Sequence, residues 1–260
     1  MTTPSSAHAA NKGRLLLVPN TLDLGAEAAD IQDIVPLGVL RQAAALAHWV
    51  VEDAKSARAF LKRVHAVVPL AQPLQTIAIS ELPRARKGSQ APVPASEWAA
   101  LLAPALAGHD MGLLSEAGLP AVADPGSALV QAAHDARLAV VPLAGASSLL
   151  LALAASGLNG QSFAFVGYLP QEAAARTARL RELEALSRRL QQTQIVIETP
   201  YRNAALLAGM LSALQPATRL SVSSGLTGPA AWTTTATVAD WRQRNVLMDD
   251  REPAVFSLLA

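Results

Sequence analysis

Short apolar runs that alternate with helix-like patterns constrain the fold of this chain more than any other feature. In the N-terminal part the runs predict strands, and the segments between them predict helices. The runs are mostly apolar instead of alternating, which is typical of a parallel sheet covered on both faces. The predicted strands are residues 14–18, 48–51, 74–79, 111–114 and 139–141. The predicted helices are residues 38–47, 54–64, 96–107, 127–136 and 148–155.

The pattern changes after the Gly-Leu-Asn-Gly segment at 157–160. Thr-rich runs lie close together there and favour antiparallel pairing. The predicted elements are a long charged helix at 173–190, a strand at 194–197, a helix at 203–214 and strands at 219–223, 232–238 and 254–259. We therefore expect two α/β domains, residues 14–158 and residues 159–260. The polar residues 1–13 are expected to form a flexible tail.

Residues 138–171 carry no charged side chain, which raises the question of a membrane segment. Prolines and glycines interrupt this stretch, and its longest purely apolar run is residues 149–155. A membrane-spanning helix needs about 20 mostly apolar residues. Residues 15–18 are too few for the apolar core of a signal peptide. We therefore expect no membrane segment and a cytoplasmic protein.

Composition excludes several kinds of chemistry. The chain has no cysteine, so disulfides, cysteine-ligated metals and a thiolate nucleophile are excluded. Its five histidines are scattered, and we expect no metal site. The net charge of +1 gives no overall attraction to nucleic acid or acidic membranes. No Gly-rich nucleotide-binding motif occurs, and Gly-Ala-Ser-Ser-Leu at 145–149 fails the nucleophile motif of serine hydrolases.

The segment 115–126 is the most informative candidate for binding. It follows a predicted strand and precedes a predicted helix, so it lies at the carboxyl edge of the sheet, where open α/β sheets bind ligands. This segment is longer than an ordinary connection between a strand and a helix, which has about 2–6 residues. Gly118 and Gly126 allow sharp turns. For Asp124, followed by Pro125, capping of the next helix is the preferred interpretation.

Other polar groups lie at predicted strand ends. Ser147 and Ser148 can offer hydroxyls and amides to a carboxylate or phosphate, or Ser147 can be a simple cap. Glu52, Asp53 and Glu198 either line a cleft or favour the positive end of a helix dipole.

Two basic features are weaker signals. Arg84, Arg86 and Lys87 occupy a proline-rich loop that can touch a phosphate backbone. The long charged helix at 173–190 carries five arginines, which share it with Glu172, Glu182 and Glu184, and we expect these charges to form a solvated face with i,i+4 pairs.

Several motifs together resemble the tetrapyrrole methylase superfamily. They include Gly-Leu-Leu-Ser-Glu-Ala-Gly-Leu-Pro, Asp-Pro-Gly and Phe-Ala-Phe-Val-Gly-Tyr-Leu-Pro. The matching segments occur in the family's order at 112–120, 124–126, 142–148, 156–158, 163–170 and 198–203. Within the superfamily, the chain is most similar to the branch of 16S ribosomal RNA ribose 2′-O-methyltransferases and their uncharacterised S-adenosylmethionine-dependent methyltransferase relatives. The resemblance extends from residue 14 to the C-terminus.

The resemblance implies a two-domain tetrapyrrole methylase-like α/β fold. Its N-terminal domain would have a mostly parallel sheet with flanking helices, and its C-terminal domain a mixed sheet with helices. It also implies that S-adenosylmethionine binds in the cleft between the domains and that the protein forms a homodimer. The positions that match the family's cofactor-binding residues are Leu114, Ser115, Glu116, Ala117, Gly118, Leu119, Ser147, Ser148 and Thr199.

The chain departs from the ribosomal RNA enzymes at four places. Glu116 replaces their aspartate, Ala144 replaces a proline, Tyr201 replaces a histidine, and residues 19–23 stand where they have a Gly-Asn signature. These departures are compatible with cofactor binding and leave the methyl acceptor open.

The functional hypothesis is therefore an S-adenosylmethionine-dependent methyltransferase, with an RNA ribose hydroxyl as one acceptor. An alcohol acceptor must lose its proton, and the candidate bases are Glu52, Asp53, Glu116 and Glu198. Two alternatives remain: methylation of carbon in a tetrapyrrole precursor, and a catalytically inactive S-adenosylmethionine-binding module.

Overall fold

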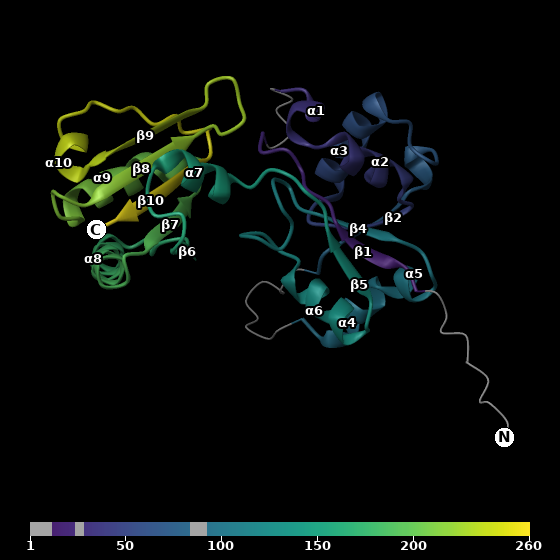
Figure 1. The fold of residues 1–260 in the computed structure, drawn as a ribbon. Helices are drawn as coiled ribbons and strands as arrows, with labels where there is room; N and C mark the ends of the chain where they lie inside the picture. The colour runs from purple at the N-terminus through teal and green to yellow at the C-terminus, as the bar shows by residue number, and fades with distance from the viewer. Residues whose placement is uncertain (1–11, 24–28, 84–92) are drawn as a thin grey trace. The chain divides into compact units, whose positions relative to one another are not determined.

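The computed structural model describes residues 12–23, 29–83 and 93–260, and the chain divides into two compact units after Ala146 (Figure 1). Most of the predicted N-terminal tail, residues 1–11, lies outside the described residues. The same holds for Arg84, Arg86 and Lys87 of the predicted basic loop. Among the residues that are described, no helix combines the length and the apolar character needed to cross a membrane.

The first unit contains a five-stranded sheet in the order β3-β2-β4-β1-β5, and all neighbouring strands are parallel. Parallel neighbours need crossover connections, which the intervening helices supply. The strands are β1 (Arg14–Leu17), β2 (His48–Val51), β3 (Ala78–Glu81), β4 (Met111–Leu114) and β5 (Ala139–Pro142). The predicted N-terminal parallel sheet is confirmed.

Helices cover both faces of this sheet, which explains why its strands are mostly apolar. Leu16 packs in a cluster with α1 (Ile31–Ile34), α2 (Leu37–Ala45) and α3 (Ala54–Val67). Its neighbour Leu15 points to the opposite face, because successive side chains of a strand alternate. There it packs with residues of α4 (Ala95–Leu101), α5 (Ala103–Leu106) and α6 (Ser127–Asp135).

Prolines account for two differences from the predicted elements of this unit. The predicted strand at 74–79 begins as a 3₁₀ turn, η1 (Leu74–Thr76), which follows Pro73, and β3 starts only afterwards. The predicted helix at 96–107 is split into α4 and α5, with Pro104 in the first turn of α5, where a missing N–H is tolerated.

The second unit contains a mixed sheet in the order β6-β7-β10-β8-β9. Only β6 and β7 are parallel, and the other neighbours are antiparallel, as the Thr-rich sequence predicts. The strands are β6 (Phe163–Gly167), β7 (Thr193–Glu198), β8 (Arg219–Ser224), β9 (Trp232–Thr237) and β10 (Ala254–Leu259).

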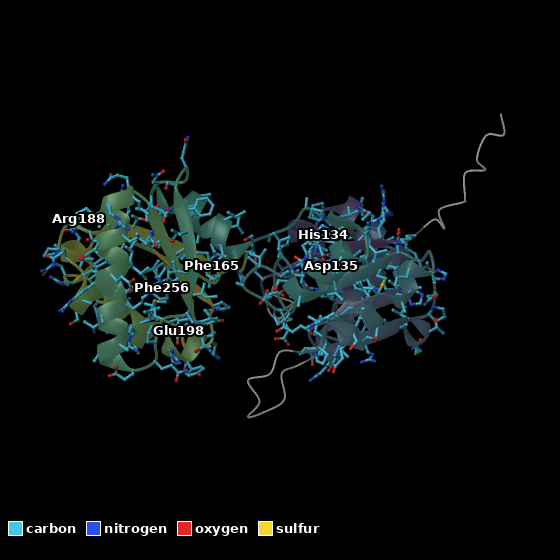
Figure 2. The ribbon with its side chains drawn as sticks, turned by 90° about the horizontal axis from the view of Figure 1, so that it is seen from below. His134, Asp135, Phe165, Arg188, Glu198 and Phe256 are labelled. Atoms are coloured by element: carbon cyan, nitrogen blue, oxygen red, sulfur yellow. The ribbon has the colours of Figure 1, made fainter. Side chains whose placement is uncertain are left out.

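One face of this sheet carries three helices and the other carries one. Phe256 packs in the cluster formed with α8 (Ala173–Leu190), α9 (Asn203–Ala213) and α10 (Val238–Trp241). Phe165 belongs to the cluster on the α7 (Ser148–Ser156) side (Figure 2). On α8, the expected solvated face holds for Arg179 and Glu182, which form an exposed i,i+3 ion pair.

Two predictions for the second unit need correction. The boundary lies after Ala146 and not at residue 158, so the predicted domains 14–158 and 159–260 are shifted by one helix. The reason is that Leu149 and Leu153 of α7 pack against Ile195 and Val255 of the second sheet. Glu184 of α8 is buried and not solvated; it accepts hydrogen bonds from the amide of Gln215 (2.8 Å) and the hydroxyl of Thr218.

Candidate functional site

The carboxyl edge of the first sheet brings two of the predicted acidic residues together. Glu52 follows β2, and Glu116 follows Ser115 at the end of the neighbouring β4. The amide of Glu52 donates to the carbonyl of Leu114 (3.1 Å), and the amide of Glu116 donates to Glu52 Oε2 (3.2 Å). The loops after the two strands are therefore joined through a predicted catalytic candidate.

Asp124 joins this group, although the sequence favours a capping role for it. Its carboxyl group lies within hydrogen-bonding reach of Ser115, whose hydroxyl donates to the carbonyl of Ala117 (3.1 Å), and it feels the charges of Glu52 and Glu116. Burial, followed by the negative charge of Glu52, raises the pKa of Asp124 to about 6; Ser115 opposes the shift, and Glu116 adds to it.

The capping prediction for Asp124 is wrong. Helix α6 begins at Ser127, with Gly126 at the N-cap position and no side-chain cap. The loop turns through Ala121 and Ala123, which have left-handed φ values of 65° and 64°, so Asp124 is placed beside Ser115. Non-glycine residues in this region are strained, and such strain concentrates at functional sites.

Asp53 interacts with the start of a helix, which is one of the two roles that its place in the sequence allows. Its side chain accepts a hydrogen bond from the amide of Ser56 (2.7 Å) and caps α3. A carboxylate in this position also interacts favourably with the helix dipole. Capping therefore accounts for Asp53 at this strand end.

The loop after β4 is also tied to the loop after β1. The amide of Asn20 donates to the carbonyl of Gly118 (2.9 Å), and the amide of Gly118 donates to Thr21 (3.3 Å). Gly118 has a φ of +63°, and a Cβ atom there would lie 3.3 Å from Leu22 Cδ2. Position 118 therefore suits glycine. In the sequence, Asn20 stands out only as part of the segment 19–23, where the chain departs from the family pattern.

In the second unit, Ser147 occupies the N-cap position of α7 but makes no side-chain capping hydrogen bond. Its side chain is buried, and the following Ser148 is the first residue of the helix. The interpretation as a simple serine cap is therefore not supported. The Ser147 hydroxyl therefore does not accept a hydrogen bond from the backbone amides of the first turn of α7. Amides at a helix start that no side chain caps can bind an anionic group of a ligand.

The end of β7 holds Glu198 and Thr199. Glu198 is buried and forms an ion pair with Nε of Arg202. Among the described residues, the buried Thr199 Oγ1 has no hydrogen-bond partner. The nearby Asn203 is buried; its Nδ2 donates to the carbonyl of Glu252 (3.0 Å), and its Oδ1 has no partner in the same part of the chain. Buried polar atoms without partners cost about 1–3 kcal/mol each, so a ligand or water that satisfied them would stabilise the site.

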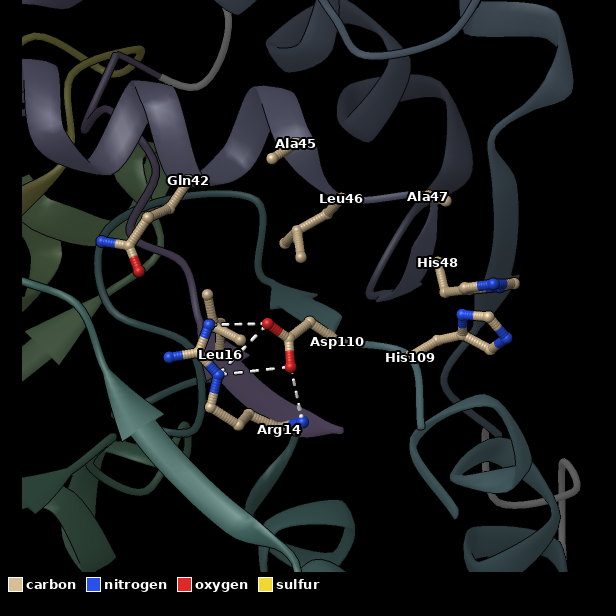
Figure 3. A pocket seen from close by; sticks show the side chains of 9 residues that line it. All are labelled: Arg14, Leu16, Gln42, Ala45, Leu46, Ala47, His48, His109 and Asp110. Carbon is tan, nitrogen blue, oxygen red and sulfur yellow. Dashed lines mark hydrogen bonds and ion pairs between the residues drawn. The ribbon is translucent and has the colours of Figure 1, made fainter. Parts of the chain in front are cut away.

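A pocket lies at the opposite, amino edge of the first sheet (Figure 3). There Asp110 holds the Arg14 guanidinium through contacts as short as 2.6 Å, and this hydrogen bonding lowers the pKa of Asp110. The rings of His48 and His109 lie 5.3 Å apart at the side of the pocket. None of the predicted cofactor-binding or catalytic residues lines it. Within the described residues, no group of three or more acidic or histidine side chains is arranged to hold a metal ion.

The chain is similar to a known protein family and to several known proteins. Residues 39–242 match the family model described as "Tetrapyrrole (Corrin/Porphyrin) Methylases". The chain is 39% identical over 127 residues to a ribosomal RNA small subunit methyltransferase I of Mesorhizobium japonicum, covering 49% of this chain and 42% of that protein. It is 41% identical over 109 residues to the protein of the same name from Vibrio cholerae, covering 42% and 36%. The matches thus span less than half of the length of these curated relatives.

The fold also has a solved counterpart. The crystal structure of the methyltransferase CobJ superposes with a TM-score of 0.56 at 16% identity, covering 94% of this chain and 93% of that one. This similarity supports the predicted two-domain fold.

Proposed function

The chain belongs to the tetrapyrrole methylase family, and we propose that it is an S-adenosylmethionine-dependent methyltransferase. The observation that carries the proposal is the family match over residues 39–242, which extends through both units. The curated relatives named above are methyltransferases by name, which supports the same activity.

The residues present fit this cofactor in two respects. The loop Ser115–Gly118 lies at the carboxyl edge of a parallel sheet, the edge where such sheets bind ligands. The buried hydroxyl of Thr199 lacks a hydrogen-bond partner among the described residues, as expected of a group that contacts a bound molecule. We propose that Leu114, Ser115, Glu116, Ala117, Gly118, Leu119, Ser147, Ser148 and Thr199 hold the cofactor, as the resemblance implies.

When bound, S-adenosylmethionine supplies an activated methyl group on a positively charged sulfur. The task of the chain is to hold the acceptor close to that methyl group and to exclude water. A hydroxyl acceptor must also give up a proton, and the carboxylates at this edge are suited to receive it. Of the candidates, Glu52 and Glu116 lie together there, with Asp124 beside them. Asp53 is engaged in capping, and Glu198 is paired with Arg202.

We propose an RNA hydroxyl as the acceptor. The support is the name of the curated relatives, which refers to ribosomal RNA. The test is a methyl-transfer assay with radiolabelled S-adenosylmethionine and fractionated extract, including ribosomal subunits and small molecules, from cells that lack the gene. Label in RNA supports the acceptor, whereas label in a tetrapyrrole precursor supports the alternative substrate. Cofactor binding without transfer to any fraction of the extract would identify an inactive binding module.

We also propose that the protein is a cytoplasmic homodimer, because the resemblance implies a homodimer and the names of the curated relatives refer to ribosomal RNA. Light scattering coupled to size-exclusion chromatography tests the first part, since a dimer has twice the mass of the chain. Fractionation of cells that express a tagged protein tests the second.

A further inference from the structure

Asn20, in the loop after β1, is buried and has its side-chain amide fully engaged. Its Nδ2 donates to two successive carbonyls of the loop after β4, Ser115 O (3.1 Å) and Glu116 O (2.9 Å). Its Oδ1 accepts a hydrogen bond from the amide of Thr21 (2.8 Å). A side-chain amide has two donor hydrogens, and here both are used on the same loop.

These contacts determine which way two amides of the loop face. In a trans peptide the C=O and N–H groups point in opposite directions, and no cis peptide occurs in the described chain. Because the carbonyls of Ser115 and Glu116 both face Asn20, the amides of Glu116 and Ala117 face away from it. The Glu116 amide indeed donates to Glu52 Oε2 (3.2 Å), and the Ala117 amide donates to no other described residue.

Successive N–H groups that face one side form a concavity that binds an acceptor atom. The Glu116 amide already binds a carboxylate oxygen, that of Glu52. A second carboxylate would be repelled by Glu52, Glu116 and Asp124. A hydroxyl does not meet this obstacle, because it can accept from an amide and donate to a carboxylate.

A buried network holds Asn20 in place. Its neighbour Thr21 donates a hydrogen bond to Asp23 (2.6 Å), and Arg63 of α3 contacts both residues, 3.1 Å from Thr21 Oγ1 and 3.3 Å from the Asp23 carboxylate. The side chains of Arg63 and Asp23 are only 13% and 5% exposed. Removing one partner from such a buried pair is costly, so the loop that carries Asn20 is firmly anchored.

We propose that Asn20 is a positioning residue: it orients the Glu116 amide to hold the Glu52 carboxylate and the Ala117 amide to bind a ribose hydroxyl of the cofactor beside that carboxylate. The proposal rests on the proposed function, since it assumes that S-adenosylmethionine is the ligand. It goes further by assigning a role to a residue outside the expected cofactor-binding set and by naming the group of the ligand that the Ala117 amide binds.

The test measures ligand affinity by calorimetry for the full chain and its Asn20→Ala and Asn20→Asp variants. Two ligands are used: S-adenosylmethionine and 5′-methylthioadenosine, which keeps the ribose but lacks the amino-acid part. Asn20→Asp preserves the shape of the side chain but replaces the donor with an acceptor. It therefore tests the loss of the two donated hydrogen bonds even if the alanine variant folds poorly. We expect both variants to lose at least about tenfold in affinity for both ligands.

Trp49→Phe is the control for a purely structural effect. It removes a buried hydrogen bond to Leu46 in the same unit and leaves the loop after β4 untouched. Urea unfolding gives the stability of each variant, and hydrogen exchange of the Gly118 amide reports the loop directly. We expect faster Gly118 exchange in the Asn20 variants only, and an unchanged affinity in Trp49→Phe.

The possible results separate the two proposals. If the unsubstituted protein binds neither ligand, the proposed function fails, and the assigned ligand fails with it. If both Asn20 variants bind like the unsubstituted protein, or if Trp49→Phe loses affinity to the same extent, only the positioning role is overturned. A loss confined to S-adenosylmethionine would assign the Ala117 amide to the amino-acid part and overturn the ribose assignment.

Discussion

The carboxylate of Glu52 accepts a hydrogen bond from the amide of Glu116, 3.2 Å away, and so joins the loops that follow β2 and β4. Asp124 lies beside this pair and feels the negative charge of both residues. The carboxyl edge of the first sheet therefore brings Asp124 under the influence of two further carboxyl groups, which raise its pKa.

Replacing Glu52 with glutamine is expected to lower the pKa of Asp124 from about 6 toward its ordinary value, because the negative charge of Glu52 is the largest cause of the shift after burial. The measurement is a carbon-detected NMR titration of the aspartate carboxyl groups. Asp135→Asn, an exposed substitution on α6, is the control and should leave the titration of Asp124 unchanged. An identical Asp124 titration in Glu52→Gln would contradict the arrangement.

Replacing Asp124 with asparagine is expected to stabilise the protein at neutral pH. Between pH 3.8 and about 6 the folded protein keeps a proton on Asp124 that the unfolded chain has released. Ionisation of Asp124 therefore lowers stability as the pH rises through this window, and the penalty is complete above it. Because Asp124 is only partly buried, solvent screening reduces the gain in the variant to about 1–2 kcal/mol.

Urea unfolding of the Asp124→Asn variant at several pH values tests this sign. The gain in the free energy of unfolding over the unsubstituted protein should be complete at about pH 7.5 and should vanish at about pH 4. A variant that is less stable at neutral pH, or whose advantage grows as the pH falls, would show that Asp124 is stabilised as a carboxylate.

Gly145→Ala is expected to destabilise the first unit by about 1–3 kcal/mol, because the added Cβ would overlap the ring of Pro19 and overpack the site. Gly38→Ala is the matched control. A Cβ at Gly38 meets nothing within 4 Å, and alanine favours the helix α2, so this variant should gain about 0.5 kcal/mol. Urea unfolding measures both, and equal effects of the two substitutions would count against the close contact.

Thr199→Val is expected to weaken S-adenosylmethionine binding about fivefold to tenfold and to raise the stability of the ligand-free protein by about 1 kcal/mol. The reason is that Thr199 Oγ1 is buried and has no partner in the described chain, so the substitution removes an unsatisfied polar atom from the ligand-free protein and a hydrogen-bonding group from the proposed site. In Thr193→Val, at the other end of β7, a hydroxyl bonded to Asn159 O (2.9 Å) is lost. That control should lose about 1 kcal/mol of stability and keep its affinity. Calorimetry and urea unfolding distinguish the two, and an unchanged affinity in Thr199→Val would remove Thr199 from the proposed site.

Sequence patterns predicted the elements with a strong local signal. The helix at 173–190 and the strands at 48–51, 111–114 and 254–259 have the predicted bounds. Strand β6 was missed as a strand, although its residues were recognised as part of a family motif. It has one parallel neighbour, β7, and a register shift before Gly167, so its pairing follows from the sheet and is not visible in the local pattern.

The candidate site likewise has features that the sequence predicts and features that depend on the tertiary structure. The sequence by itself determined the parallel sheet, the loop at its carboxyl edge and the family, because apolar periodicity and ordered motifs are local or sequential properties. Only the tertiary structure decided that Asp124 faces Glu52 and Glu116 instead of capping α6, since left-handed turns at Ala121 and Ala123 redirect the loop. It likewise decided that Asn20 holds Ser115, 95 positions away, because hydrogen bonds between distant loops exist only once the strands between them have paired.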